Sequence, residues 1–294
     1  MTAVVVKMTE RDVALLVDIY KYRYLTISQF QQLHFPSLQT AYRRTKILKR
    51  DGCISGFNVA NTDEGIFSLT AKGLDIVASA LGVDRVDLKW NEAKEKPKDY
   101  YFMRHFIAIN DFRIAMRQAC EQSTLRLLGF IPDYYGEKTD KGGVTKYIKD
   151  MICDVANERE KVSHTPDAVF ALEKDGRAAL FFLEIDRGTE VVAAPRRGVL
   201  KYLRFYASYL VDGKYQRYAR DFAVEGFKGF RTLIVTSTQA RLLSIRRAST
   251  EMDVPPKAKR FLWVTTEDKI TPDKVFTPIW KSIDSEDSTT YRIG

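Results

Sequence analysis

Apolar residues recur at helical spacing near the start of the chain and predict a first amphipathic helix. Thr9 is a residue type that begins helices, and Asp12 three positions later is placed to return a hydrogen bond to it. The apolar positions that follow are Val13, Leu16, Ile19 and Tyr20. Their spacing puts them on one face, so this helix is expected to pack against a core.

Two further helices are predicted before residue 51. Thr26 is expected to cap a short helix that Pro36 ends, because the residue before a proline is steered out of helical conformation. Ser37 then caps a third helix over residues 38–50. This third helix carries five basic residues and no acidic residue, which is the charge distribution of a helix that lies against phosphates.

The pattern then changes to short strands. Residues 54–59 and 66–69 indicate two strands joined by a polar turn at 61–65, and another helix is expected over residues 70–81. The stretch that contains Phe67, Leu69, Thr70 and Gly73 resembles the aromatic-x-Leu-Thr-x-x-Gly end of many bacterial winged helix-turn-helix regulators. Residues 1–82 are therefore predicted to form a winged helix-turn-helix domain that binds DNA.

In winged helix-turn-helix proteins the third helix enters the major groove, which assigns candidate DNA contacts. The candidates for base edges are Gln39, Thr40, Tyr42, Arg43 and Arg44, and the candidates for phosphates are Lys46, Lys49 and Arg50. Asp63 and Glu64 in the predicted wing count against close phosphate contact there. The alternative is a protein-interaction domain whose basic helix is only a solvated face.

A second domain is predicted after a highly charged linker at residues 83–99. Helices are expected at 100–120, about 195–211 and 239–248, and strands at 125–130, 168–172, 179–185, 232–235 and 261–264. Helix, three strands, helix, strand is the core order of the PD-(D/E)xK, or restriction-endonuclease-like, fold. We expect an α/β protein with this core at 100–275, a C-terminal tail at 276–294 with a flexible acidic end at 284–288, and either a long hairpin or a mobile loop at 132–164.

The predicted hairpin at 166–187 resembles a nuclease active site with one residue exchanged. In the PD-(D/E)xK pattern an aspartate and a glutamate on adjacent strands hold a divalent cation, and a lysine two residues after the glutamate acts on the attacking water. Asp167 and Glu184 match the two metal ligands, but the lysine position is Asp186. Since alternate residues of a strand share a face, Glu184 and Asp186 are expected on the same side. The core is therefore predicted to be a degenerate one.

Two interpretations of these carboxylates stay open. In the first, Asp167, Glu184 and Asp186 bind Mg²⁺ or Mn²⁺, and Lys201 on the next helix replaces the missing lysine. In the second, an arginine neutralises the cluster and no chemistry follows; the candidates are Arg187, Arg196 and Arg197. Arg196 and Arg197 are also candidate DNA contacts, because they begin a basic stretch with interleaved aromatic residues.

Composition and charge add a few limits. The chain has 294 residues and a net charge of +9, which favours a polyanionic partner without proving one. Its three cysteines show no C-x-x-C spacing, so neither a disulfide framework nor a cysteine zinc site is indicated. The three histidines have no metal-ligand spacing. No apolar run is long enough for a membrane span, and a cytoplasmic location is expected.

Several of these features together resemble the bacterial replication-relaxation family. They are the N-terminal domain, the helix with His105 and Asp111, the Pro166-Asp167 strand, and the stretch from Phe182 to Glu190 followed by Lys201-Tyr202. The resemblance implies a setting on plasmids and other mobile elements, and a role in replication and DNA relaxation. In that setting Asp186 belongs to a family signature.

The sequence thus predicts a double-stranded DNA-binding protein of a bacterial plasmid or mobile element. It would act in replication, mobilisation or transcriptional control without cleaving DNA. Candidate partners besides DNA are replication or mobilisation proteins and a second copy of the chain. The first alternative is a Mg²⁺-dependent endonuclease or nickase that uses Asp167, Glu184 and Asp186. The second is an adaptor whose basic surfaces meet acidic protein.

Overall fold

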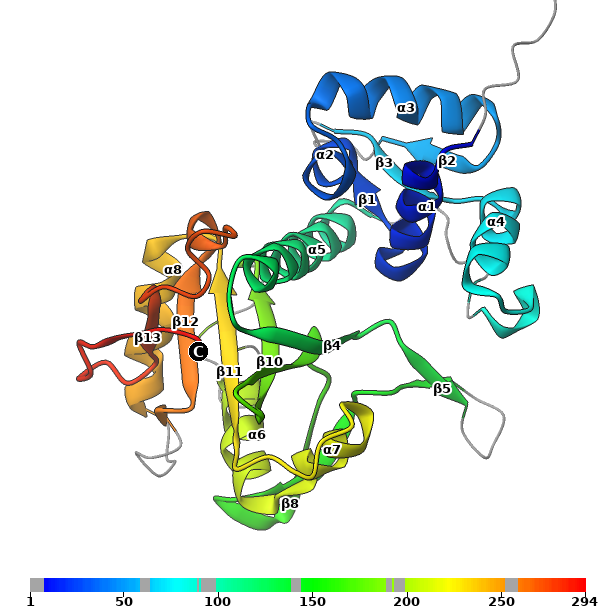
Figure 1. The fold of residues 1–294 in the computed structure, drawn as a ribbon. Coiled ribbons are helices and arrows are strands. Elements are labelled where there is room, and N and C mark those ends of the chain that lie inside the picture. Colours follow the sequence, from blue (N-terminus) through cyan, green and yellow to red (C-terminus); the bar gives the residue numbers. More distant parts are fainter. Residues whose placement is uncertain are drawn as a thin grey trace, which may run out of the picture. The chain divides into compact units, whose positions relative to one another are not determined.

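The computed structural model describes residues 8–58, 64–88, 90, 99–138, 144–188, 192, 199–251 and 259–294. The chain divides into two compact units, Met1–Ile114 and Ala115–Gly294 (Figure 1). Each unit has its own cluster of buried apolar side chains. Helices and several sheets together make this a mixed α/β protein, as the sequence predicts.

The first unit combines helices with a small antiparallel sheet. Its helices are α1 (Glu10–Tyr22), α2 (Ile27–His34), α3 (Leu38–Arg50) and α4 (Ala71–Leu81), followed by the 3-10 turn η1 (Arg85–Asp87). Its strands are β1 (Leu25–Thr26), β2 (Ile54–Phe57) and β3 (Ile66–Leu69), in the order β1-β3-β2. Every helix and strand expected from the pattern here is present, and only the two-residue β1 is additional.

Side chains fix the starts of these helices. Thr9 and Asp12 form a capping box at α1, in which the Thr9 amide donates to Asp12 Oδ2 at 2.7 Å. Thr26 and Gln29 form a second box at α2, with reciprocal bonds of 3.0 and 3.2 Å. These bonds satisfy amides at the start of each helix that have no partner within the helix.

The Thr70-to-Gly73 motif has a direct physical explanation. Thr70 Oγ1 accepts from the Gly73 amide at 3.2 Å and donates to the Gly52 carbonyl at 2.6 Å. A Cβ atom on Gly73 would lie 2.1 Å from the Cys53 carbonyl oxygen. Only glycine therefore allows α4 to approach the turn before β2 this closely.

Helix α5 (Tyr100–Glu121) contributes its residues up to Ile114 to the first unit. Asn110 donates to the Tyr24 carbonyl at 2.6 Å, and Gln29 donates to Asp111 at 2.7 Å. Ile114 belongs to the first core, and Trp90 packs against that core. The unit therefore extends beyond the linker expected at 83–99, because α5 supplies buried groups that complete it; residues 89 and 91–98 lie outside the described part.

The second unit is built on a seven-stranded sheet of order β14-β13-β12-β11-β10-β9-β4. The strands are β4 (Arg126–Pro132), β9 (Ala168–Lys174), β10 (Arg177–Asp186), β11 (Phe230–Thr236), β12 (Leu262–Thr266), β13 (Trp280–Ser282) and β14 (Thr290–Tyr291). The central strands β10, β11 and β12 run parallel, and the flanking pairs are antiparallel. The strands expected from residues 125–264 all lie in this sheet.

Helices and short turns complete the second unit. They are α6 (Val199–Asp212), α7 (Tyr218–Asp221), α8 (Gln239–Ala248), η3 (Lys214–Arg217), η4 (Ser249–Glu251) and η5 (Glu267–Lys269). Phe182 of β10 contacts the rings of Tyr206 and Tyr209 on α6, Tyr218 on α7 and Phe230 on β11. This aromatic cluster is the centre of the second core.

The stretch left open at 132–164 forms two separate hairpins. The first pairs β5 (Gly136–Lys138) with β6 (Val144–Lys146), and the second pairs β7 (Asp150–Asp154) with β8 (Asn157–His164). The glycines expected in the turn at 142–143 lie outside the described residues. Neither the single long hairpin nor the mobile loop is therefore what the structure contains.

The end of the chain differs from the tail expected outside the core at 276–294. Strands β13 and β14 extend the sheet, Trp280 is fully buried, and Trp263 stacks on Tyr291 at 5.0 Å between ring centroids. The acidic residues at 284–288 favour a solvated end in the sequence, but they lie between the short strands β13 and β14. No helix within the described ranges has both the length and the apolar character needed to cross a membrane.

Candidate functional site

Helix α3 carries most of the predicted DNA contacts, and its orientation is set by three buried residues. Ala41, Thr45 and Leu48 face the core, and the Thr45 hydroxyl donates to the Ala41 carbonyl at 2.8 Å. Ser37 caps the helix by accepting from the Thr40 amide at 3.3 Å. The opposite side of α3 therefore faces outward.

The outward side of α3 holds polar and basic side chains. Those that the structure places in solvent are Gln39, Tyr42, Arg43, Lys46, Lys49 and Arg50. The Lys46 ammonium lies 4.7 Å from the Tyr42 ring centroid, and Arg50 forms an exposed ion pair with Asp51 at 3.0 Å. Thr40 is half-buried, and its hydroxyl lies 3.0 Å from that of Ser37.

Arg44 lies apart from this outward group. Its guanidinium makes two hydrogen bonds to the carboxylate of Asp12, which is fully buried on α1. Burial alone would raise the pKa of Asp12, but the bonds from Arg44 and Thr9 outweigh it and hold that pKa below its usual value. Arg44, predicted as a base contact, is thus used to join α3 to α1.

Glu64, which the sequence places in the wing, also has a partner within the fold. Its carboxylate accepts from the Ser28 amide at 3.2 Å and from the Ser28 hydroxyl. Ser28 lies in the first turn of α2, where free amides favour a negative charge. Glu64 therefore anchors the chain just before β3 to α2, while Asp63 lies outside the described residues.

In the second unit, Asp167 and Glu184 lie on neighbouring strand ends, as expected. The Asp167 amide donates to the Leu183 carbonyl at 3.0 Å, which ties the start of β9 to β10. Asp167 Oδ2 accepts from the Ile185 amide at 2.6 Å. One oxygen of this predicted metal ligand is thus used by the backbone of the adjacent strand.

Glu184 is buried and shares two polar partners. His164 at the end of β8 lies 2.7 Å from Glu184 Oε1, and the Tyr206 hydroxyl of α6 donates to the same oxygen. Burial raises the pKa of Glu184, and the neighbouring His164 opposes this only in part. Rings of Tyr202, Phe205 and Tyr206 surround the histidine at 5.5 Å.

Asp186 faces the same side as Glu184 but is paired with an arginine from α8. Arg241 binds it in a bidentate manner at 2.6 and 3.0 Å, and the Gly188 amide donates to it at 2.9 Å. Arg187, one of the arginines expected to neutralise the cluster, instead pairs with Glu267. Arg196 and Arg197, the other candidates, lie outside the described residues.

Lys201, proposed as a substitute catalytic lysine, is exposed on α6. The buried side of that helix carries Tyr202, Tyr206 and Tyr209, and it is Tyr206 that reaches Glu184. The structure therefore brings Asp167 and Glu184 together and sets Asp186 beside Arg241. It does not bring Lys201 to them.

These residues do not fit a divalent cation. Within the described residues there is no group of three or more histidine, cysteine, aspartate and glutamate side chains with metal-binding geometry. A cation at Asp186 would have to displace the Arg241 guanidinium, and one at Glu184 would compete with the Tyr206 hydroxyl. The carboxylates have protein partners, and the arginine paired with Asp186 is Arg241, which is not among the arginines expected for this role.

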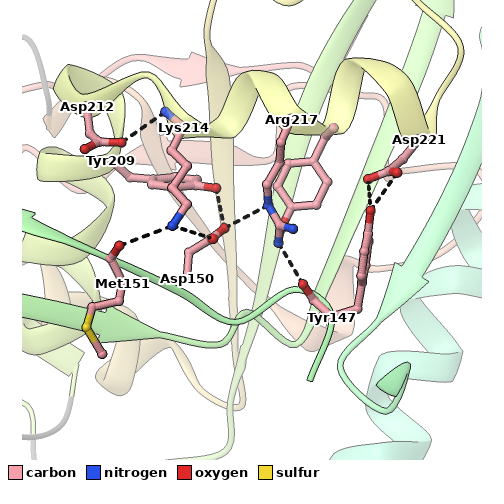
Figure 2. A network of polar contacts seen from close by, with 9 residues as sticks. Tyr147, Asp150, Met151, Tyr209, Asp212, Lys214, Arg217 and Asp221 are labelled. Carbon is pink, nitrogen blue, oxygen red and sulfur yellow. Dashed lines mark hydrogen bonds and ion pairs between the residues drawn. The ribbon is translucent and has the colours of Figure 1, made fainter. Parts of the chain in front are cut away.

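A second polar network, not foreseen in the sequence, joins the β7–β8 hairpin to α6 (Figure 2). Asp150 of β7 accepts from the Tyr209 hydroxyl at 2.5 Å and from Arg217 Nε at 3.1 Å. The Lys214 ammonium lies 3.3 Å from the other carboxylate oxygen. Arg217 also donates to the Tyr147 carbonyl at 2.8 Å.

The same hairpin has a further attachment to α6. Asp154, almost fully buried, is paired with Arg204, and the Ser208 hydroxyl accepts from the Val155 amide at 2.9 Å. Burial along β7 alternates, with Asp150, Ile152 and Asp154 inward. The sequence Asp-Met-Ile-Cys-Asp has three apolar residues in a row, so it contains no alternation that marks the two aspartates as inward-facing.

Comparison with known proteins gives one match. The family model described as replication-relaxation matches residues 16–223, which includes most of the first unit and the second unit through α7. No curated protein and no solved structure matches the chain. The match covers more than half of the 294 residues and contains both α3 and the β9–β10 carboxylates. The chain therefore belongs to the replication-relaxation family.

Proposed function

We propose that this protein binds double-stranded DNA of a plasmid or mobile element and acts in its replication, mobilisation or transcriptional control without cutting it. The first unit would be a winged helix-turn-helix. Its element order, α1-β1-α2-α3-β2-β3-α4, and its sheet order, β1-β3-β2, support that assignment. The family name supports a role in replication and relaxation.

The single observation that carries DNA binding is the outward side of α3. Arg43, Lys46 and Lys49 are exposed there, and none of them has a carboxylate partner among the described residues. Since the fold uses Arg44 but leaves these three cations in solvent, their charge is available to phosphates. A helix that only interacts with water would gain nothing from excluding acidic residues along its length.

The proposal that DNA is not cut rests on the second unit. The order α5, β4, β9, β10, α6, β11 supports a PD-(D/E)xK-like core. However, Asp186 replaces the lysine and is held by Arg241, and Glu184 is held by His164 and Tyr206. We assign this unit to contact with DNA or with replication and mobilisation proteins.

Duplex binding by fluorescence anisotropy tests the first part. Arg43→Ala combined with Lys46→Ala should weaken binding at least tenfold, because two phosphate or base contacts are lost. Arg85→Ala is the matched control, since Arg85 is an exposed arginine of the same unit that lies outside α3. Unchanged binding by the double variant would favour the adaptor that meets acidic protein.

Incubation with supercoiled plasmid and Mg²⁺ or Mn²⁺ tests the second part. We expect the plasmid to stay supercoiled under conditions in which a mobility shift shows that it is bound. Nicking that disappears in both Asp167→Ala and Glu184→Ala would overturn the non-cleaving assignment and establish the nuclease alternative. Lys201→Ala would then show whether that exposed lysine takes part.

A further inference from the structure

The outward side of α3 is not uniform, and its geometry separates the candidate contacts. With 3.6 residues per turn, positions 39, 43, 46 and 50 fall within about 60° of one another. This ridge lies opposite the buried residues Ala41, Thr45 and Leu48. Side chains on the ridge project farthest from the body of the unit and are the first to meet a groove.

The residues beside the ridge are partly buried or lie against other residues of the unit. On one flank Tyr42 lies against Lys46, and Lys49 lies toward β2, where a Cβ atom on Gly56 would be 3.5 Å from the Lys49 ammonium nitrogen. On the other flank Thr40 is half-buried and Arg44 is paired with Asp12. Of the five predicted base contacts, only Gln39 and Arg43 therefore lie on the ridge.

We propose that Gln39 and Arg43 determine which DNA sequence this protein prefers, by reading an adenine and a guanine in the major groove. This inference rests on the proposed function. Arginine pairs bidentately with O6 and N7 of guanine, and glutamine pairs with N6 and N7 of adenine. Lys46 and Arg50, farther along the ridge, hold phosphates.

The spacing of the two readers limits the target. Residues four apart on a helix are separated by about 6 Å along its axis. Base pairs in DNA are stacked about 3.4 Å apart. The adenine and guanine are therefore expected within about two base-pair steps of each other, and the intervening pair should be less constrained.

The orientation of the ridge depends on the Asp12–Arg44 pair. The Arg44 side chain is 17% exposed and that of Asp12 is 1% exposed, so the pair is largely shielded from water. It links α3 to α1 in the same turn that carries Arg43. Arg44 thus positions the two readers and contacts no base itself.

Selection from a duplex library with a randomised core tests this inference on the full chain. The wild type should enrich a motif with one adenine and one guanine in close succession. Arg43→Gln should lose the guanine preference by about 5- to 150-fold, the range for one bidentate base contact, while the adenine preference stays. Gln39→Ala should have the converse effect.

Arg50→Gln is the comparison variant, because it removes a charge from the same ridge without touching a base. It should weaken all sequences equally and lower the slope of log K against log salt by about 0.9. Circular dichroism melting establishes that each variant is folded, as expected for exposed positions.

The outcomes distinguish failure of this inference from failure of the proposed DNA-binding function. If the wild type selects a motif and Arg43→Gln retains the same guanine, the inference is overturned and DNA binding stands. If Arg50→Gln changes the motif, the division between readers and phosphate contacts is wrong. If the wild type binds no duplex at all, the proposed function fails, and the inference with it.

Discussion

Each buried carboxylate near the β10 strand end is compensated by a group from another element. Asp186 has Arg241 from α8, Glu184 has His164 from β8 and Tyr206 from α6, and both are less than a tenth exposed. A buried charge without such partners would be costly. Polar partners from other elements therefore accompany Glu184 and Asp186 in this structure.

Glu184→Gln should alter the pH dependence of stability. Burial raises the pKa of Glu184 in the folded state above its ordinary value of 4.5. The protonated form therefore favours folding, and this contribution is lost as pH rises through the folded pKa. The loss is about 1.4 kcal/mol for every tenfold difference in the acid's dissociation constant between the folded and unfolded states. In urea unfolding between pH 4 and 8, the free energy of unfolding of the variant should increase relative to that of the wild type as pH rises.

Glu158→Gln is the control for that measurement, because it removes an exposed carboxylate from β8, the strand that ends at His164. A stability difference between wild type and Glu184→Gln that stays constant over the whole pH range would contradict a raised pKa for the buried Glu184.

At the residue scale the sequence predicts which side of a strand a residue faces, but it does not predict the residue with which it pairs. The strand period correctly places Glu184 and Asp186 on one side, and both meet helices of the same core. The partner of Asp186, however, is 55 residues away in the chain, and no local pattern connects the two. The pairing of Arg44 with Asp12 could not be predicted for the same reason, since Asp12 lies 32 residues before it.

At the scale of elements, the β7–β8 hairpin is attached to α6 mainly by charged and hydroxyl groups. Asp150 and Asp154 supply the hairpin side of these contacts, while Tyr209 and Arg204 are among those on α6. Such contacts fix position and register because a shift of one residue would turn Asp150 and Asp154 to the outer face and take them away from Arg217 and Arg204. Helices α3 and α8 were foreseen at their observed bounds, but this hairpin was not, because its inward residues are polar.

Asp150→Ala should loosen this hairpin selectively. The change leaves the Tyr209 hydroxyl and the Arg217 guanidinium without their shared acceptor, and we expect a loss of about 3 kcal/mol in stability. Hydrogen exchange read by mass spectrometry should rise in residues 150–164 and change little in β9 to β12. Glu225→Ala, an exposed acid between α7 and β11, is the control and should leave both regions unchanged.

For the whole molecule, the division into units was expected but its position was not. A change in composition shows where the chain becomes polar. The end of a compact unit depends instead on which residue is the last to contribute a buried side chain to it. For the first unit that group comes from α5, through Asn110 and Ile114. Strands β13 and β14 at the end of the sheet were not predicted, because two or three residues give no usable period.

Two fragments test the extent of the first unit. A chain of residues 1–121 should unfold cooperatively, whereas a chain of residues 1–99 should lose at least about 3 kcal/mol, since it lacks Phe106 and Ile114 at about 1.5–3 kcal/mol each. Thermal unfolding by circular dichroism compares them. Equal stability of the two fragments would restore the boundary at the charged linker.

The burial of the tryptophans gives each unit its own optical signal. Trp90 packs on the first core, while Trp263 and Trp280 are buried in the second sheet, and these are the three tryptophans of the chain. Replacing Trp90 with phenylalanine leaves emission from the second unit alone, and replacing the other two leaves emission from the first. The order in which the units lose structure can thus be followed by intrinsic fluorescence without any attached dye.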